Sequence, residues 1–445
     1  MIFVRDILRI CHGKLICGNE NTECINFIND TRSLNKGDVF VGIKGETFNG
    51  NTFYKEAIKK GACVCILDDE TVLENNKEKV AIVLVDDSIK AIQELAKYKR
   101  SLYDIPVIAV TGSVGKTSVK DMVNAVVSSN YKTLCTKGNM NNHIGVPLTI
   151  LGLKDHEALI VEMGMNHLGE IHTLSNIAKP TLALITNIGT AHIGNLGSRE
   201  NILKAKMEIT DGLNGSLIIN NDNDMLRTVK YDKLITIGID NDSDYVAKDI
   251  EDNIFSINFH IDNEYISLPV GSKAFVYNAL FAYAVGKKLN IPNNKIVNAL
   301  ENFKLTPHRL ELITHKDYQI IDDTYNASLD SVNNALEMLG KVSGRKVFIF
   351  GDILELDNYA LEIHKEIGQS VIKNKIDVLI TVGENAYHTY SIAYNAGIES
   401  YHYKNNDEMI KEIDKIIDIN DTILVKGSHG MNLIEVVEHL KNFKN

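Results

Sequence analysis

The feature that most constrains the fold is a glycine-containing turn between an apolar run and a segment with helical periodicity. Residues 107–110 predict a buried strand, and residues 116–127 place their apolar side chains at helical spacing. Between them stands Thr111-Gly-Ser-Val-Gly-Lys-Thr117. Because glycines let backbone N–H groups approach phosphate oxygens and a helix N-terminus adds positive potential, this arrangement predicts a phosphate cradle in an α/β layer.

The lysine and threonine of the turn suit a nucleoside triphosphate with a divalent cation. Lys116 can reach the β- and γ-phosphates, and the Thr117 hydroxyl can hold Mg²⁺. The usual phosphate loop has a glycine five residues before its Gly-Lys pair, where this chain has Val110. A turn with a chance Gly-Lys-Thr is the alternative, and the flanking strand and helix argue against it. The predicted loop consists of Gly112, Ser113, Val114, Gly115, Lys116, Thr117 and Ser118.

Length and composition indicate a globular protein of several domains. The chain has 445 residues, of which 44% are hydrophobic and 24% are charged. Its formal net charge of −11 argues against nucleic acid as the main partner, because phosphate backbones require a surplus of Lys and Arg. Cys63 and Cys65 alternate in an apolar run, which predicts buried thiols, and six cysteines without a C-x-x-C pair indicate a reducing compartment. With no signal-peptide pattern and no apolar run of roughly 18 residues, we expect a cytoplasmic enzyme without a membrane span.

Strand-like and helical segments alternate in three blocks. Residues 1–102 form a small α/β block, with strands expected at 39–43, 63–67 and 81–85 and helices at 53–60 and 89–99. Residues 103–311 contain strands that are apolar on both faces, which predicts a parallel sheet between helices. These strands are expected at 107–110, 158–162, 182–186 and 216–220. Period-two alternation in 245–270 predicts antiparallel strands late in this domain.

Residues 312–445 predict a second doubly wound, Rossmann-like sheet. Its strands are expected at 319–321, 347–350, 378–382 and 422–425, and its helices at 330–339 and 359–373. The fold class predicted for the whole chain is therefore α/β with three domains, at 1–102, 103–311 and 312–445.

Polar residues follow the strands of the second block, where ligands of open α/β sheets bind. Glu162 ends one strand, His192 follows another, and Lys206 lies on a later helix. Together with Thr117, they offer oxygens and an imidazole that can hold Mg²⁺ beside phosphates. Alone, Glu162 could cap the next turn, His192 could be a satisfied core or loop histidine, and Lys206 could be a solvated helix residue. The hypothesis depends on their joint position.

Two segments near the second domain joint also suit a nucleotide enzyme. Arg309, in Thr306-Pro-His-Arg-Leu-Glu311, could clamp a phosphate with its guanidinium, or form an inter-domain salt bridge. Asp322 or Asp323 ends a strand and could bind a ribose hydroxyl or the metal shell. The alternative is turn chemistry, which Asp and Asn favour.

These residues resemble the ATP-dependent Mur ligases of peptidoglycan synthesis, and among them the MurF type. The resemblance spans nearly the whole chain. The matching segments are Asp30-Thr-Arg-Ser33, Lys36-Gly-Asp38, Lys44-Gly-Glu46, 111–117, Gly138-Asn-Met-Asn-Asn-His-Ile-Gly-Val-Pro-Leu-Thr149, Glu162-Met-Gly-Met-Asn-His-Leu-Gly-Glu170, Asn187-Ile-Gly-Thr-Ala-His192, 198–208, 322–331, Gly351-Asp-Ile-Leu-Glu-Leu356 and Lys426-Gly-Ser-His-Gly430.

The resemblance implies an activity and a set of roles. A UDP-N-acetylmuramoyl-tripeptide would be joined to D-alanyl-D-alanine, with ATP and Mg²⁺, through an acyl phosphate. Lys116, His192, Lys206 and Arg309 would be catalytic, and Lys206 would carry a carbamate that bridges to a metal. Thr117, Glu162, His192 and Lys206 would hold the metal ions. ATP would also contact Asn278, Arg309, Asp322 and Asn326, while the substrate would contact Asp30, Thr31, Arg32, Lys44, Asn139, Asn141 and Asn142. We expect a monomer.

The chain departs from the resemblance at three positions. Many relatives have a histidine at the place of Ala274, Asn-Pro where this chain has Ser328-Leu329, and an arginine at the place of His429. Another ligase of the superfamily, of the MurE type or a folylpolyglutamate synthetase, is the alternative enzyme. A nucleotide-binding regulatory protein without turnover is the alternative from another class. The presence of Lys116, Glu162, His192 and Lys206 argues against it.

Overall fold

The computed structural model describes the chain except for Glu46, residues 75–79 and residues 443–445. Glu46 of the predicted Lys44-Gly-Glu46 motif therefore lies outside the described residues. The predicted α/β class is confirmed, because parallel strands predominate in the larger sheets. The chain forms two compact units, and the predicted domain boundaries stay predictions. The first unit is Met1–Thr111, Tyr131–Leu184 and Ala205–Leu217, and the second is Gly112–Asn130, Ile185–Lys204 and Ile218–Asn445.

A five-stranded sheet begins the first unit. Its strand order is β2-β7-β6-β5-β4, and β2 alone is antiparallel to its neighbour. Phe40, Tyr54 and Cys65 are buried in its core. The predicted strands and helices are confirmed with small shifts of their ends. The elements are β1 (Ile2–Phe3), α1 (Val4–Ile10), β2 (Lys14–Cys17), β3 (Glu23–Cys24), β4 (Phe27–Ile28), β5 (Val39–Val41), α2 (Tyr54–Lys59), β6 (Val64–Leu67), β7 (Ala81–Leu84) and α3 (Ser88–Ser101).

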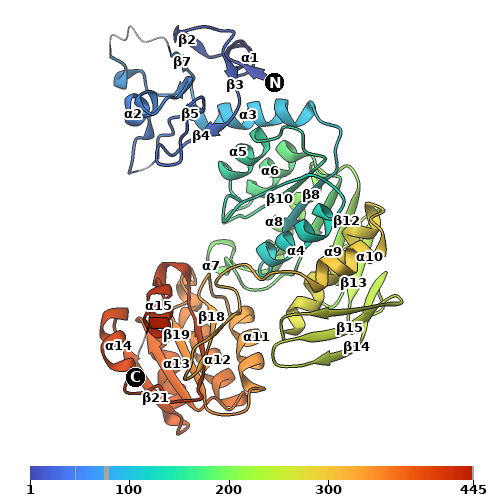
Figure 1. Ribbon diagram of the computed structural model, residues 1–445, viewed down its shortest axis with the longest axis vertical. Coiled ribbons are helices and arrows are strands. Elements are labelled where there is room, and N and C mark those ends of the chain that lie inside the picture. The colour runs from blue at the N-terminus through green and yellow to red at the C-terminus, as the bar shows by residue number, and fades with distance from the viewer. Residues whose placement is uncertain (46, 75–79, 443–445) are drawn as a thin grey trace. The chain divides into compact units, whose positions relative to one another are not determined.

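Buried parallel strands form the rest of the first unit. β8 (Val107–Thr111) and β9 (Thr133–Cys135) pair on either side of β10 (Ala158–Glu162), and β11 (Leu182–Ile185) follows β8 in the strand order. Helix α3 packs against α5 (Gly145–Leu151) and α6 (Glu170–Ala178), as Figure 1 shows. Arg100 fixes this packing, because its Nε donates to the carbonyl of Ala178 at 2.9 Å.

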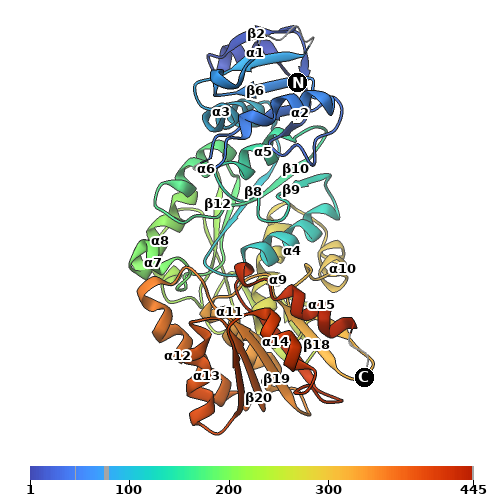
Figure 2. The ribbon, with the colours of Figure 1, turned by 90° about the vertical axis from the view of Figure 1, so that its left-hand side faces the viewer.

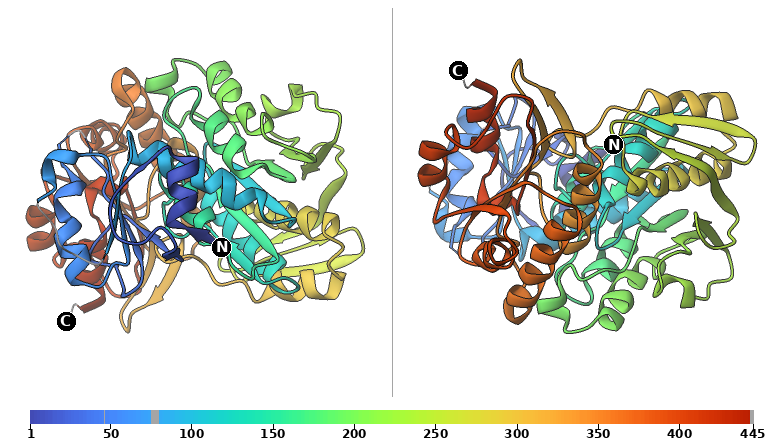
Figure 3. Two further views of the ribbon diagram at one scale, coloured as in Figure 1. Left: turned by 90° about the horizontal axis from the view of Figure 1, so that it is seen from above. Right: turned by 90° about the horizontal axis from the view of Figure 1, so that it is seen from below.

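The second unit begins with α4 (Lys116–Ser128), which packs against α9 (Lys273–Lys288). The antiparallel strands predicted in 245–270 are confirmed, and they lie beside α9 and α10 (Figures 1 and 3). β13 precedes them and is parallel to β14. β12 and α8 have residues in both units. The elements are α7 (Ile193–Leu196), α8 (Arg199–Met207), β12 (Ser216–Asn220), β13 (Leu234–Gly238), β14 (Tyr245–Asp252), β15 (Ile257–Ile261), β16 (Glu264–Leu268) and α10 (Asn293–Glu301).

A six-stranded sheet of order β17-β18-β22-β19-β20-β21 ends the second unit. Only β17 is antiparallel to its neighbour. Figure 2 shows α11, α12 and α13 on one face and α14 and α15 on the other, so the predicted doubly wound sheet is confirmed. The elements are β17 (Glu311–Thr314), β18 (Gln319–Asp323), α11 (Leu329–Gly340), β19 (Lys346–Gly351), α12 (Ala360–Lys373), β20 (Val378–Val382), α13 (Ala386–Asn395), β21 (Glu399–Tyr403), α14 (Asn406–Ile413), β22 (Thr422–Lys426) and α15 (Ile434–Asn442).

All six cysteines are free thiols. Cys65 is buried as expected. The expectation was wrong for Cys63, which stands just before β6 and is only partly buried, and its Sγ donates to the carbonyl of Gly37 at 3.0 Å. Among the described residues, no helix has both the length and the apolar character needed to span a membrane.

His364 on α12 is buried as a neutral ring. Its Nε2 accepts a hydrogen bond from Ile353 N at 3.1 Å, so its Nδ1 carries the proton and donates to the carbonyl of Ala360 at 2.8 Å. Burial lowers the pKa of His364 below its usual value, and the nearby Asp352 offsets this only in part.

We predict that acid destabilises this packing through His364. In the unfolded chain the pKa of this histidine is about 6.5, and the neutral ring contributes its full stability above that pH. The stability is lost as the pH falls toward the lower pKa of His364 in the folded protein, because the unfolded chain takes up the proton first. The urea midpoint should therefore drop less between pH 7.5 and 5.5 in His364→Gln than in the wild type. His143→Gln, at an exposed histidine, is the control, and an equal drop in all three proteins would contradict the prediction.

Candidate active site

Two glycines shape the turn between β8 and α4. Gly112 has φ +148° and Gly115 has φ +82°, both in the region that favours glycine. A Cβ at Gly112 would lie 1.9 Å from Thr186 Oγ1, so no larger residue fits there. Gly115 is the N-cap of α4, which begins at Lys116. The turn therefore has the close backbone approach and the helix N-terminus that a phosphate site needs.

The segment after β11 fixes the conformation of this turn through hydrogen bonds. Ser113 N donates to the carbonyl of Asn187 at 3.0 Å, and Val114 N donates to Asn187 Oδ1 at 2.8 Å. Thr186 Oγ1 donates to the carbonyl of Val114 at 2.5 Å, and Gly189 N donates to Ser113 Oγ at 3.0 Å. These four hydrogen bonds within the protein fix the shape of the turn.

Lys116 folds over the same turn. Its Nζ donates to the carbonyl oxygens of Gly112 at 2.8 Å and Ser113 at 3.4 Å. Carbonyl groups are neutral acceptors, so a phosphate anion would bind this ammonium more strongly than they do. Thr117 and Ser118 are buried in the first turn of α4.

Helix α9 places Asn278 beside the turn. The side chain is buried, and its Oδ1 lies 3.7 Å from where a Cβ on Gly115 would stand. Ala274 is one helical turn earlier and partly buried. The adjacent Tyr277 donates its hydroxyl to Asp222 Oδ2 at 2.9 Å, and burial is the main cause that raises the pKa of Tyr277. The second unit thus brings Asn278 to the turn, as its predicted role requires.

Glu162 ends β10 in the first unit with a buried carboxylate. Its Oε1 accepts from Asn141 Nδ2 at 2.8 Å. Its Oε2 is fully buried and, among the described residues, has no hydrogen-bond partner. A buried, unsatisfied anionic oxygen is costly unless a cation compensates it, so Glu162 fits the predicted metal ligand.

Other predicted residues of the first unit have different surroundings. Lys206 is completely buried, which is rare for a lysine and fits a modified side chain. Asn142 Oδ1 accepts from the backbone N–H groups of Ile144 and Gly145, at the start of α5. Asn142 therefore orders the backbone that leads into α5, while Asn139 is exposed.

His192 stands at the N-terminus of α7 with φ +65°. Its side chain is 21% exposed, and its Nδ1 lies 3.6 Å from Glu355 Oε2. Glu355 lies in the segment between β19 and α12. The sequence did not predict its contact with His192.

Arg309 packs over an aromatic ring in the second unit. Its guanidinium carbon lies 3.9 Å from the centre of the Tyr325 ring. Its Nε is buried and has no hydrogen-bond partner among the described residues. Cation–π contact leaves the planar donors available for an anion, so this geometry fits the predicted phosphate clamp.

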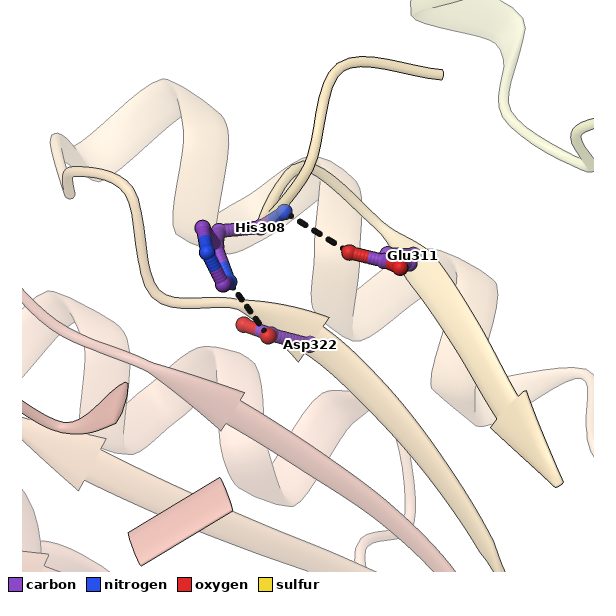
Figure 4. Close-up of side chains that lie close together, drawn as sticks. All are labelled: His308, Glu311 and Asp322. Atoms are coloured by element: carbon purple, nitrogen blue, oxygen red, sulfur yellow. Dashed lines mark hydrogen bonds and ion pairs between the residues drawn. The ribbon is translucent and has the colours of Figure 1, made fainter. Parts of the chain in front are cut away.

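Asp322 is fully buried at the end of β18 and is already hydrogen bonded. Its Oδ2 contacts His308 Nδ1 at 2.7 Å, and its Oδ1 accepts from Thr324 Oγ1 at 2.7 Å. Figure 4 shows Asp322 with His308 and Glu311, whose Oε2 accepts from His308 N at 3.0 Å. The side chain thus orders the joint before β17, and its predicted role toward ATP stays a prediction.

Asp323 forms a buried ion pair with Lys426. Lys426 Nζ lies 2.5 Å from Asp323 Oδ2 and also donates to the carbonyl of Asn326 at 2.9 Å. Burial raises the pKa of Asp323, and Lys426 opposes this shift. Asn326 Oδ1 accepts from the backbone N–H of His429 at 3.4 Å, while the His429 side chain is exposed. Lys426 belongs to the motif Lys426-Gly-Ser-His-Gly430, but the sequence does not predict its pairing with Asp323, because the two residues are far apart along the chain.

The predicted substrate residues of the first block differ in their exposure. Arg32 donates to both carboxylate oxygens of Asp30, and this pairing lowers the pKa of Asp30 to about 2. Thr31 is buried, and its carbonyl accepts from Lys60 Nζ at 2.8 Å. Lys44 is exposed. The Asp30–Arg32 pair is a charged, solvent-accessible group that suits a polar ligand.

Comparison with family models covers most of the chain. Residues 25–100 match "Mur ligase family, catalytic domain", residues 110–286 match "Mur ligase middle domain", and residues 308–429 match "Mur ligase, glutamate ligase domain".

Similar proteins and structures match over nearly the whole length. The UDP-N-acetylmuramoyl-tripeptide--D-alanyl-D-alanine ligase of Bacillus subtilis is 36% identical, with 98% of each chain covered. The ligase of the same name from Escherichia coli is 33% identical, with 93% of this chain and 92% of the relative covered. The crystal structure of MurF from Acinetobacter baumannii superposes with a TM-score of 0.90 at 29% identity, covering 99% of both chains. The crystal structure of MurF from Thermotoga maritima in complex with ADP superposes with a TM-score of 0.82 at 27% identity. The match covers 94% of this chain and 97% of that chain. The three-domain α/β fold of these structures is the fold of this chain.

We predict that the Asp323–Lys426 pair is essential for stability. Lys426→Met leaves a buried carboxylate without its cation and should lower the free energy of unfolding by about 3–5 kcal/mol. Adding Asp323→Asn should restore part of the loss. Urea denaturation of both variants, with Lys365→Met at an exposed lysine as control, measures the effect. A single variant as stable as the control would refute this assignment.

Proposed function

Because this chain belongs to the Mur ligase family, we propose that it joins D-alanyl-D-alanine to a UDP-N-acetylmuramoyl-tripeptide at the expense of ATP, in peptidoglycan precursor synthesis. The observation that carries the proposal is the match, over 98% of both chains, to a ligase of that name. The preformed phosphate turn at 112–117 and the buried, unsatisfied Glu162 oxygen support it from the structure.

The reaction forms an amide through an acyl phosphate. The terminal carboxylate of the tripeptide attacks the γ-phosphorus of ATP, and ADP leaves. The amine of the dipeptide then attacks the acyl carbon, the phosphate leaves, and the nitrogen loses a proton. Such chemistry requires oriented reactants and compensating charge more than side-chain acid–base catalysis.

The phosphate turn provides orientation and positive charge. Gly112, Ser113, Val114, Gly115, Thr117 and Ser118 line it, and Lys116 would neutralise the transferred phosphoryl group. Asn278 would contact the nucleotide from α9. Arg309, just before β17, would bind a phosphate through its guanidinium, and Asp322 and Asn326 would lie near the nucleotide.

Mg²⁺, when bound, compensates phosphate charge and orients the oxygens of the reacting groups. We assign Thr117 and Glu162 to a first ion and His192 to a second. A carbamate on Lys206 would add an anionic oxygen ligand, which agrees with the complete burial of this lysine. Asp30, Thr31, Arg32 and Lys44 would bind the uridine nucleotide, and Asn139, Asn141 and Asn142 the remainder of the substrate.

The proposal also includes the oligomeric state, the cellular location and the domain boundaries. The chain acts as a monomer, in the cytoplasm, with domains at 1–102, 103–311 and 312–445. Size-exclusion chromatography coupled to light scattering would reveal a dimer if the first is wrong.

Phosphate release by the purified enzyme tests the function. It should require ATP, Mg²⁺, the UDP-tripeptide and D-alanyl-D-alanine together, and mass spectrometry should detect the pentapeptide product. Release with a single amino acid in place of the dipeptide would favour a MurE-type ligase or a folylpolyglutamate synthetase. Release with neither second substrate would indicate an ATPase or switch protein.

We predict that Lys116→Met lowers kcat by at least about 10²-fold, because a preorganised charge on the phosphoryl group is removed. Steady-state kinetics of phosphate release measure it, with Lys295→Met, at an exposed lysine of α10, as the control for loss of a lysine. Equal losses in both variants would indicate a structural effect instead.

We predict that Glu162→Gln raises the Mg²⁺ concentration for half-maximal rate by about 10-fold or more, because an amide is a weaker ligand than a carboxylate. The same variant should unfold at a similar or higher temperature without Mg²⁺, since it removes an uncompensated buried charge. Kinetics at varied Mg²⁺ and thermal unfolding without it provide the two measurements. An unchanged Mg²⁺ requirement would remove Glu162 from the metal site.

A further inference from the structure

The segment Glu355–Tyr359, between β19 and α12, contacts the loop that carries His192. Glu355 Oε2 lies 3.6 Å from His192 Nδ1, and the Tyr359 hydroxyl donates to the carbonyl of Gly197 at 3.3 Å. The two contacts flank α7, and Figure 2 shows α7 beside the start of α12. Both segments belong to the second unit, so the contact is part of one compact body.

A third contact lies between the other two. A Cβ on Gly194 would stand 2.6 Å from Asp357 Oδ2, so the carboxylate of Asp357 rests directly on the loop backbone. Glu355 has φ +62°, Asp357 has φ +45° and His192 has φ +65°. Non-glycine residues adopt this conformation at a cost, and they retain it where their surroundings hold them. The backbone therefore holds Glu355 and His192 toward each other at the expense of strain.

The packing of Glu355 gives no reason for this strain. Its side chain is 69% exposed, so it contributes little to the core. Its carboxylate lies 3.6 Å from Nδ1 of the His192 ring, an ion-pair distance that is longer than a hydrogen bond. A metal-binding histidine commonly donates the N–H of its other ring nitrogen to a carboxylate, which fixes the tautomer and the ring orientation. A carboxylate at Nδ1 favours the proton there and leaves Nε2 as the nitrogen that can bind a cation.

We propose that Glu355 is a positioning residue for His192, holding the imidazole as the Nδ1–H tautomer so that Nε2 serves as the metal ligand. This inference rests on the proposed ligase function, in which His192 holds a divalent ion. Asp357 and Tyr359 keep the segment against the loop. The last sheet of the chain thus contributes to the metal site through Glu355, although it provides no metal ligand in this assignment.

The tautomer of His192 can be measured without nucleotide, metal or turnover. In protein labelled with ¹⁵N-histidine, the His192 signals are assigned by their loss in His192→Gln. The wild type should show the proton on Nδ1, and Glu355→Ala should shift the ring toward the Nε2–H form. Glu362→Ala, which removes an exposed carboxylate of α12, should change nothing. A wild-type ring protonated on Nε2, or no change in Glu355→Ala, would overturn the proposal.

Kinetics of phosphate release provide the second readout. Glu355→Ala should raise the Mg²⁺ concentration for half-maximal rate by about 10- to 100-fold, while the KM for D-alanyl-D-alanine changes less than about 2-fold. Glu355→Gln, which keeps an acceptor oxygen, should lie between. Glu355→Gly should share the Mg²⁺ defect yet unfold at an equal or higher temperature, since glycine tolerates the positive φ.

The two hypotheses fail in different ways. If the wild type turns over with both substrates but all Glu355 variants keep the wild-type Mg²⁺ midpoint, the positioning role is wrong and the ligase function stands. If the wild type releases no phosphate with both substrates, the ligase function is wrong and the positioning role falls with it.

Discussion

The candidate site depends on one constraint, which is the close approach of the segment 186–189 to the turn 112–115. Thr186 occupies the space that a Cβ on Gly112 would need, and Asn187 bonds both Ser113 and Val114. The turn therefore has its shape before a ligand arrives, so binding need not order this backbone. The Lys116 ammonium donates to carbonyl oxygens of the turn. Phosphate oxygens can take the place of these neutral acceptors and bind the ammonium more strongly, because they are anionic.

Buried charged side chains occur in two different arrangements. Asp323 and Lys426 compensate each other within the last sheet, so this pair can order the turn that carries Asn326 without a ligand. Glu162 is different, because one of its oxygens is buried without a hydrogen bond in the described part of the chain. The Asp323–Lys426 pair stabilises the fold by itself, whereas the Glu162 carboxylate favours the binding of a cation that compensates its charge. This contrast separates structural from functional charges.

Local sequence pattern predicted the central strands and long helices because apolar residues recur there with a clear period. The phosphate turn was also predictable, since Gly112, Gly115 and Lys116 have roles fixed by backbone geometry. The sequence did not predict the short strands β9 and β4, because a strand of so few residues shows no detectable periodicity. The contact of Glu355 with His192 was not predictable, since it depends on tertiary packing between distant segments and on positive φ at both residues. Asn142 was predicted as a substrate residue, but its hydrogen bonds to the backbone at the start of α5 also explain its type.

The departures from the family pattern have different structural consequences. Where relatives have Asn-Pro, Ser328 caps α11 by accepting from Ser331 N, and Leu329 is buried as the first helical residue, so the helix start is retained. His429 keeps a backbone bond to Asn326 but brings no permanent charge. Lys426 cannot replace that charge, because Asp323 already pairs with it. Arg309, with an unbonded Nε above the Tyr325 ring, is therefore the cation of this region best placed to bind an anionic ligand.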